Sequence, residues 1–86
     1  MRNPTPEENE QYIRDCMSLW RMFFGEMSKI PHGVEWIHTH QMYWTTYNTL
    51  WFYLVVKDVP TQHAIWILMD SQMRAETDWQ QSRDKK

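Results

Sequence analysis

Residues 34–57, VEWIHTHQMYWTTYNTLWFYLVVK, decide the fold because their composition and their periodicity predict different structures. The composition favours strands, since 15 of these 24 residues are β-branched or aromatic. The periodicity favours a helix, because apolar residues recur at spacings of three and four along most of the stretch. The choice between these two predictions sets the architecture of the whole chain.

Two features of this stretch lead us to predict strands. The run Thr45-Thr46-Tyr47-Asn48-Thr49 is a poor helix interior, costing about 2–3 kcal/mol in propensity against alanine. The same run can reverse the chain, because asparagine tolerates a positive φ. We therefore predict an antiparallel pair of strands here, with a third strand if residues 19–24 pair beside it.

Helical patterns lie on both sides of the stretch. Thr5 fits an N-cap, Pro6 fits the first helical position, and Glu8 completes a capping box. A helix is expected from about 6 to at least 17, and another over 61–81 after a break at 58–61.

The order helix, strands, helix predicts an α+β fold with both helices on one face of a short antiparallel sheet of two or three strands. The alternative is an all-α three-helix bundle with helices near 6–29, 34–57 and 61–81. In either case residues 1–86 are expected to form a single small domain, with 1–5 and 82–86 as frayed tails. The expected core residues are Ile13, Met17, Trp20, Phe24, Trp36, Trp51, Leu54, Ile65, Leu68 and Met69.

Charge and hydropathy exclude several classes of partner. Nine Lys and Arg against eleven Asp and Glu give a net charge of −2, without the basic footprint that nucleic acid binding needs. The longest apolar run, residues 50–56, is far shorter than the roughly 20 residues that span a bilayer. No signal peptide pattern opens the chain, and the single cysteine, Cys16, permits no intrachain disulfide. We expect a soluble protein, compatible with the cytoplasm, that binds neither nucleic acid nor membrane.

Histidines supply the one pattern with a metal-ligand spacing. On a strand, His38 and His40 would project from one face about 7 Å apart. Glu35 or His32 could add a ligand through the preceding turn, and His63 from the last helix. An open position on such a site would support a metal-dependent hydrolase, which is the alternative prediction. Because an HxH pair specifies little by itself and no catalytic motif accompanies it, the main prediction is no enzyme, no metal and no cofactor.

Aromatic residues exceed what one small core can hide. The chain has six Trp and four Tyr, and each ring can bury about 150–250 Å². Trp66, Tyr53, Phe52 and Trp44 are the residues expected at an exposed aromatic surface, which typically marks an interface. The sequence thus favours a homo-oligomer or a protein partner over any other binding class.

Residue usage is unusual for a natural chain. Leu, Ala and Gly number 4, 2 and 2, whereas Met and Trp number 7 and 6. Such flattened usage is typical of residues selected for fit to a backbone. The main functional expectation is a designed or redesigned domain without an evolved activity. The alternatives are a natural protein-interaction module or homodimer that uses the aromatic surface, and the histidine metal site.

Overall fold

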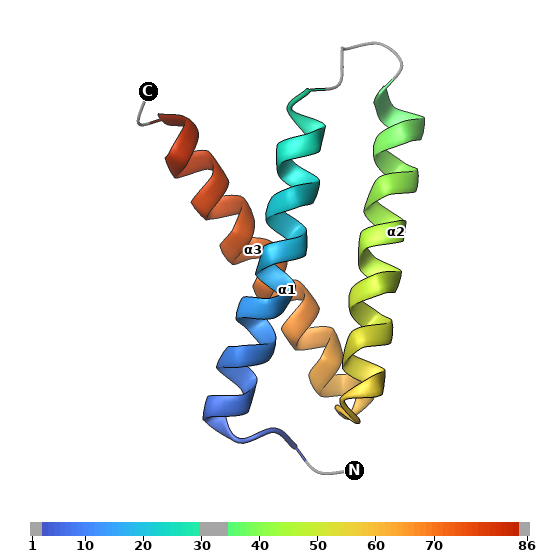
Figure 1. Ribbon diagram of the computed structural model, residues 1–86, viewed down its shortest axis with the longest axis vertical. Coiled ribbons are helices and arrows are strands. Elements are labelled where there is room, and N and C mark those ends of the chain that lie inside the picture. The colour runs from blue at the N-terminus through green and yellow to red at the C-terminus, as the bar shows by residue number, and fades with distance from the viewer. Residues whose placement is uncertain (1–2, 30–34, 85–86) are drawn as a thin grey trace.

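The computed structural model describes residues 3–29 and 35–84, which form three helices and no strand (Figure 1). Helix α1 spans Pro6–Met27, α2 spans Glu35–Val56 and α3 spans Thr61–Asp84. The α+β prediction is therefore wrong, and the alternative three-helix architecture is the observed one. Residues 19–24 and 35–56, which we expected as strands, lie inside α1 and α2.

Burial of one face explains why α2 is helical in spite of its composition. Leu50 and Leu54 are buried in the core, and Tyr43 and Tyr47 pack against it from the same side of α2. Burying one leucine side chain contributes about 1.5–3 kcal/mol. Two leucines therefore offset the propensity cost of about 2–3 kcal/mol that the threonine-rich run imposes.

The residues that suggested strands also interact along α2, one turn apart. The Tyr43 and Tyr47 rings stack with their centroids 6.3 Å apart, and Tyr47 and Trp51 stack at 6.5 Å with their planes 8° apart. The Thr49 hydroxyl donates a hydrogen bond to the Thr45 carbonyl at 2.8 Å. Ring pairs at i and i+4 stabilise a helix locally, so composition was a poor guide here.

The start of α1 is as the sequence predicts. The Thr5 hydroxyl accepts a hydrogen bond from the Glu8 amide at 3.2 Å, and the Glu8 carboxylate accepts one from the Thr5 amide at 2.9 Å. Pro6 occupies the first turn. The helix continues through Gly25 to Met27, ten residues beyond the minimum end that the sequence predicts.

The turn from α2 to α3 is a Schellman motif. Asp58 has a φ of 61°, its amide donates to the Val55 carbonyl at 2.9 Å, and the Val59 amide donates to the Leu54 carbonyl at 3.1 Å. Val59 and Leu54 are both buried, which supplies the apolar contact of this motif. The predicted break is confirmed, and the Pro60 carbonyl, which accepts from the Ala64 amide at 2.8 Å, begins α3.

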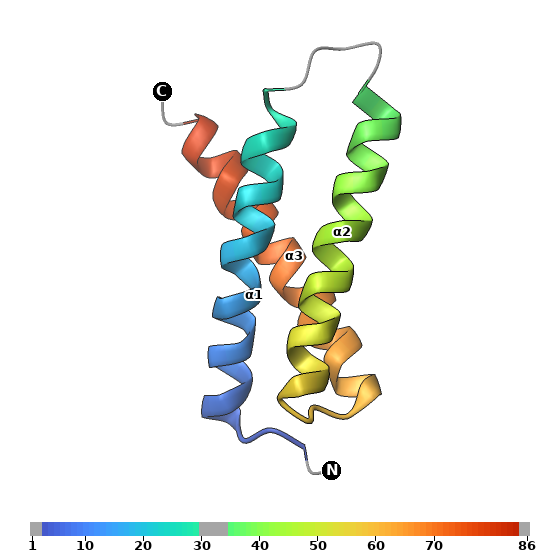
Figure 2. The same cartoon turned by 45° about the vertical axis from the view of Figure 1, so that its right-hand side comes forward.

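The core lies mainly where α3 crosses α1 (Figures 1 and 2). At the crossing, α3 presents Ala64, Ser71 and Ala75, all at most 1 % exposed. These small side chains let the two helix backbones approach closely, and the larger Ile67 and Leu68 fill the space beside them.

Part of the predicted core is wrong, because α3 is oriented about its axis differently from the prediction. Ile65 and Met69 are exposed, because α3 turns its small residues toward α1 and leaves these two at the flank. Trp51 is half-buried. The side chain of Trp36 lies outside the described residues. The predicted core residues that are buried are Ile13, Met17, Trp20, Phe24, Leu54 and Leu68.

The molecule is flat and elongated, with extents of 44 × 29 × 14 Å. Its radius of gyration is 14.1 Å, whereas a compact chain of this length has about 12 Å. Helices α1 and α2 lie side by side and α3 crosses α1 obliquely, so α2 forms one edge of the molecule (Figures 1 and 2). Within the part of the chain that the structure describes, this arrangement leaves one side of α2 without a neighbouring helix.

Candidate interaction surfaces

Six residues of α2 form a continuous exposed stripe that faces away from α1 and α3. We call this stripe the α2 outer face, and at 100° per residue its members fall within an arc of about 80°. Trp44 is 45 % exposed, Phe52 69 %, and Ile37 and Val55 53 % each. The six residues of the α2 outer face are Ile37, Gln41, Trp44, Asn48, Phe52 and Val55.

The α2 outer face carries no formal charge. Residues 36–56 contain no Asp, Glu, Lys or Arg at all. The polar members of the face are the amides of Gln41 and Asn48, and neither side chain makes a hydrogen bond to another described residue. A face of this kind can offer apolar contact and paired amide hydrogen bonds, but not ion pairs.

Neighbouring rings on α2 hold part of this face in position. The Trp44 ring makes edge-on contacts with His40, Tyr43 and Tyr47, with centroids 5.3–6.2 Å apart. Tyr43 is itself fixed, because its hydroxyl donates to the Gln72 side chain of α3 at 3.1 Å. The exposed indole is therefore supported by three neighbours in its own helix before any partner is present.

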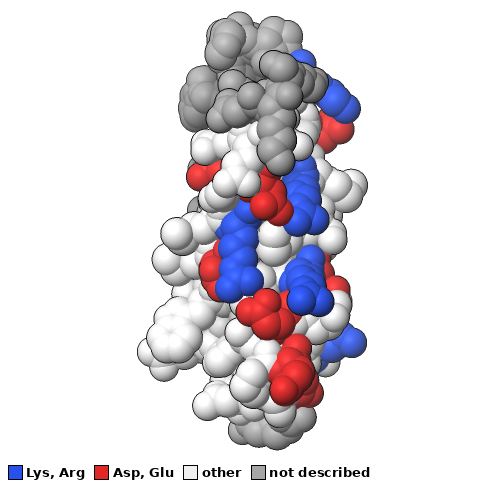
Figure 3. All heavy atoms as spheres, turned by 90° about the vertical axis from the view of Figure 1, so that its left-hand side faces the viewer, with Lys and Arg blue, Asp and Glu red and all other residues white. Residues whose placement is uncertain are grey.

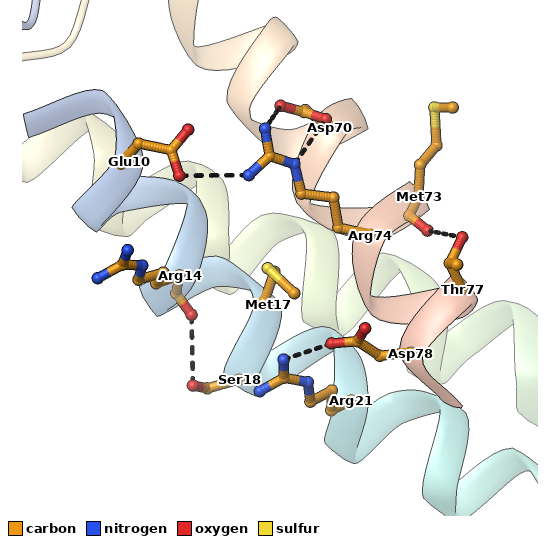
Figure 4. A pocket seen from close by; sticks show the side chains of 10 residues that line it. All are labelled: Glu10, Arg14, Met17, Ser18, Arg21, Asp70, Met73, Arg74, Thr77 and Asp78. Carbon is orange, nitrogen blue, oxygen red and sulfur yellow. Dashed lines mark hydrogen bonds and ion pairs between the residues drawn. The ribbon is translucent and has the colours of Figure 1, made fainter. Parts of the chain in front are cut away.

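A groove between α1 and α3 is the second candidate surface (Figure 4). Its volume is about 770 Å³. Ion pairs bridge the two helices across it, with Arg21 bound to Asp78 at 2.6 Å and Arg74 bound to Glu10 at 3.3 Å. The lining residues are Glu10, Arg14, Met17, Ser18, Arg21, Asp70, Met73, Arg74, Thr77 and Asp78.

Charges in the α1–α3 groove cancel. Three arginines face three carboxylates, and Figure 3 shows both signs intermixed along this side of the molecule. The hydrogen bond with Glu10 raises the pKa of Arg74 above its ordinary value, so this guanidinium stays charged. Arg14 makes no side-chain hydrogen bond or ion pair with another described residue. The groove thus combines helix-bridging ion pairs with balanced charge, and it does not present a net field for an ionic ligand.

A smaller hollow of about 520 Å³ adjoins this groove and shares Asp70 and Met73 with it. Trp66 and Met69 line it and are exposed. At its edge the His63 Nε2 lies 2.8 Å from the Asn9 side-chain oxygen, which joins α3 to α1. This hollow places Trp66 on a different surface from the α2 outer face.

The four residues predicted for an aromatic surface therefore do not form one patch. Phe52 and Trp44 share the α2 outer face, whereas Trp66 lies beside α1 on α3. Tyr53 is half-buried, and its hydroxyl donates to the Asp15 carboxylate at 2.5 Å. Burial, and then this hydrogen bond, raise the pKa of Tyr53. The helical period would have identified Ile37, Asn48 and Val55 as partners of Trp44, which the strand prediction concealed.

The histidine arrangement that we considered for a metal depended on the absent strand. On α2, His38 and His40 leave the helix about 200° apart, so they do not share a face. No group of three or more metal-ligating side chains occurs within residues 3–29 and 35–84. His32 and the side chain of Glu35 lie outside the described residues.

Cys16 lies fully buried in the core, and the Ser71 side chain of α3 interacts with it. Burial, and then the neighbouring Asp15 carboxylate, raise the pKa of the Cys16 thiol to about 12, while the Ser71 hydroxyl opposes the shift. A thiol with this pKa is an inert core group at neutral pH. In the same core the Trp20 indole N–H has no hydrogen-bond partner among the described residues.

The comparisons add no functional assignment. No protein-family model, no curated protein and no solved structure matches the chain. Among the described residues no helix has the length and apolar character of a membrane span.

Proposed function

We propose that the protein is an interaction module that docks an α-helix of a protein partner on the α2 outer face. The single observation that carries this proposal is a helix face with two exposed aromatic rings and no formal charge. Interface cores are typically enriched in aromatic residues and depleted in charge. A second exposed apolar group, Trp66, Met69 and Met73 on α3, differs from this face because it lies beside the Asp70–Arg74 ion pair.

The accessible surface of the chain supports the same proposal. It measures 6302 Å², whereas a compact monomer of 10.7 kDa exposes about 5,500 Å². The excess of about 800 Å² is close to what one partner buries in a standard interface. A flat, elongated molecule has more accessible surface than a compact one of the same mass.

Preorganisation favours docking at Trp44. The ring contacts with His40, Tyr43 and Tyr47 limit its rotamers in the free protein. Ordering a side chain on binding costs roughly 0.5–1.5 kcal/mol, and that cost is smaller for a ring that is already held. Trp is also the residue type most often found at energetic hot spots.

Selection of helical peptides on the immobilised protein tests the proposal. We expect peptides with one uncharged, apolar helical face to be enriched. Their affinity should fall at least about tenfold for Phe52→Lys, because a charge in a desolvated contact is left unpaired. The matched control is Met22→Lys, which places the same charge at an equally exposed apolar residue of α1.

Two outcomes would overturn the proposal. One is that no peptide is enriched, which would leave the face with a folding role only, as expected for a chain without evolved activity. The other is that selected peptides bind the Phe52→Lys and Met22→Lys variants equally well. Circular dichroism of both variants checks that the helices are retained.

A further inference from the structure

We propose that the partner of the α2 outer face is a second copy of this chain, bound as an antiparallel α2–α2 pair with Asn48 on the two-fold axis. This inference rests on the proposed function and names its partner. It follows from the spacing, the charge and the area of the face.

The spacing of the face is symmetric about Asn48. Trp44 and Phe52 lie four residues before and after it, and Gln41 and Val55 lie seven residues before and after it. When two copies of α2 run antiparallel about this point, each Trp44 meets the partner's Phe52 and each Gln41 meets the partner's Val55. An isologous dimer requires such self-complementarity, because the same patch is used on both subunits.

Asn48 lies at the one position of the pair that meets itself. A side-chain amide has both a donor and an acceptor, so two copies of Asn48 can hydrogen-bond reciprocally. The amide has no hydrogen bond within the described chain that would have to be broken first. A buried asparagine pair favours this register, because any shift along the helices leaves both amides without a partner.

Charge does not oppose the pairing. Each copy has a net charge of −2, but residues 36–56 contribute none of it. The ion pairs of Arg21 and Arg74 lie between α1 and α3, whereas α2 forms the edge of the molecule (Figures 1 and 3). A second copy at this edge therefore meets an uncharged surface, and the two helix dipoles run in opposite directions.

The available area indicates a weak dimer. At their exposed fractions, Trp44 and Phe52 together offer about 200 Å² per copy. Ile37 and Val55 add about 100 Å², so the apolar side chains of two copies bury roughly 600 Å², to which the Gln41 and Asn48 amides add polar area. Interfaces below about 1,200 Å² are typically weak and transient, so we expect the dimer to form only at high protein concentration.

Dimerisation is tested by sedimentation equilibrium, which measures the molecular mass of the intact protein at concentrations between about 10 µM and 1 mM. We expect the mass to rise from 10.7 kDa toward twice that value. Phe52→Lys should weaken dimerisation at least about tenfold, and Met22→Lys should change it less than about twofold. A monomer at every concentration, or equal effects of the two variants, overturns the proposal.

Cysteine cross-linking tests the antiparallel register. Under oxidising conditions we expect Asn48→Cys to form a disulfide-linked dimer. A mixture of Gln41→Cys and Val55→Cys chains should cross-link, but neither should alone, because equivalent residues seven positions from the axis are about 21 Å apart along antiparallel helices. Cross-linking of Gln41→Cys with itself would show a parallel pair and overturn the proposed geometry. The wild-type chain, with its buried Cys16, is the control.

The peptide selection and the dimerisation experiments distinguish failure of the docking proposal from failure of the second-copy proposal. If peptides dock on the α2 outer face but the protein stays monomeric, the second copy is wrong and the docking function stands. If neither peptides nor a second copy bind, both proposals are wrong.

Discussion

The α1–α3 crossing and the α2 helix are stabilised in different ways. The crossing places small residues at the point of closest approach and adds ion pairs that bridge the two helices. Helix α2 is held by a narrow inner face of leucines and tyrosines, and its outer face has no charge and no neighbour in the described chain. A chain of this size can therefore satisfy its folding requirement on one side and keep an apolar face free for another contact.

Trp20→Ala should have the largest effect, because Trp20 joins the two regions. It is fully buried and contacts both Phe23 of α1 and Tyr43 of α2. We expect a loss of about 3–5 kcal/mol in the free energy of unfolding, measured by urea denaturation. Trp66→Ala, at a residue that is 63 % exposed, is the control and should cost less than about 1 kcal/mol. Equal losses would contradict the core described above.

Alkaline pH should weaken the α1–α3 crossing through Cys16. The folded pKa of about 12 lies above the ordinary thiol value of 9.0, so the folded state keeps the proton that the unfolded chain loses. Below pH 9 the thiol is protonated in both states, and its contribution to the free energy of unfolding is fully present. As the pH rises from 9 toward 12, the free energy of unfolding falls by up to about 4 kcal/mol. Denaturation across this range measures the slope, and Cys16→Ala should reduce it. An unchanged slope in that variant would contradict the assignment to Cys16.

Tyr43→Phe tests the polar link between α2 and α3. The variant removes the hydrogen bond from the Tyr43 hydroxyl to Gln72 but keeps the ring contacts. We expect a loss of about 0.5–1.5 kcal/mol in the free energy of unfolding. Tyr12→Phe is a control in α1, where the ring also packs edge-on against another tyrosine. A neutral Tyr43→Phe variant would show that α2 is held by ring packing alone.

Asp58→Gly should stabilise the protein without changing either region. The φ of 61° at Asp58 is strained for a residue with a Cβ, and glycine is the usual residue at this point of a Schellman motif. We expect a gain of about 0.5–1 kcal/mol, and a loss for Asp58→Ala, whose side chain cannot bond locally to the turn. Thermal denaturation of the two variants measures the difference. A loss with glycine would show that the aspartate side chain itself stabilises the turn.

Arg21→Ala should have the smallest effect. The Arg21–Asp78 pair bridges α1 and α3, but both side chains are about half exposed. We expect a loss of about 0–1 kcal/mol in low salt, and less in about 1 M salt, where screening is strong. Lys29→Ala, which removes the ion pair with Glu26 at the C-terminal end of α1, serves as the control. A loss that persists in high salt would indicate that Arg21 contributes by packing.

The strand prediction failed for a specific reason. Propensity counts Thr45, Tyr47 and Thr49 against a helix, but it contains no term for what a helix can bury at Leu50 and Leu54. The tertiary contact of α2 with its neighbours contributed more than the local preference. The same error concealed the α2 outer face, because on a strand Trp44, Asn48 and Phe52 would share a face with a different set of residues.

The face of α3 illustrates a second limit of sequence reasoning. Hydrophobicity placed Ile65 and Met69 inward, whereas α3 turns Ala64, Ser71 and Ala75 toward α1. Small residues carry little hydrophobic signal, yet they determine how closely two helices can pack. Only the partner helix shows which side of α3 needs small side chains.

Features that depend on neighbours along the chain could be predicted from the residues alone. These features are the capping box at Thr5 and Glu8, the break before α3, and the burial of Ile13 and Trp20 on one face of α1. Hydrogen bonds between residues a few positions apart, and apolar residues that recur about every 3.6 positions, depend only on nearby sequence. They can therefore be predicted before the tertiary structure is known. Tertiary structure alone decided that residues 35–56 are helical and which side of α2 remains exposed. Those outcomes follow from burial against helices distant in sequence, and the apolar area that α2 buries there outweighs its own preference for an extended chain.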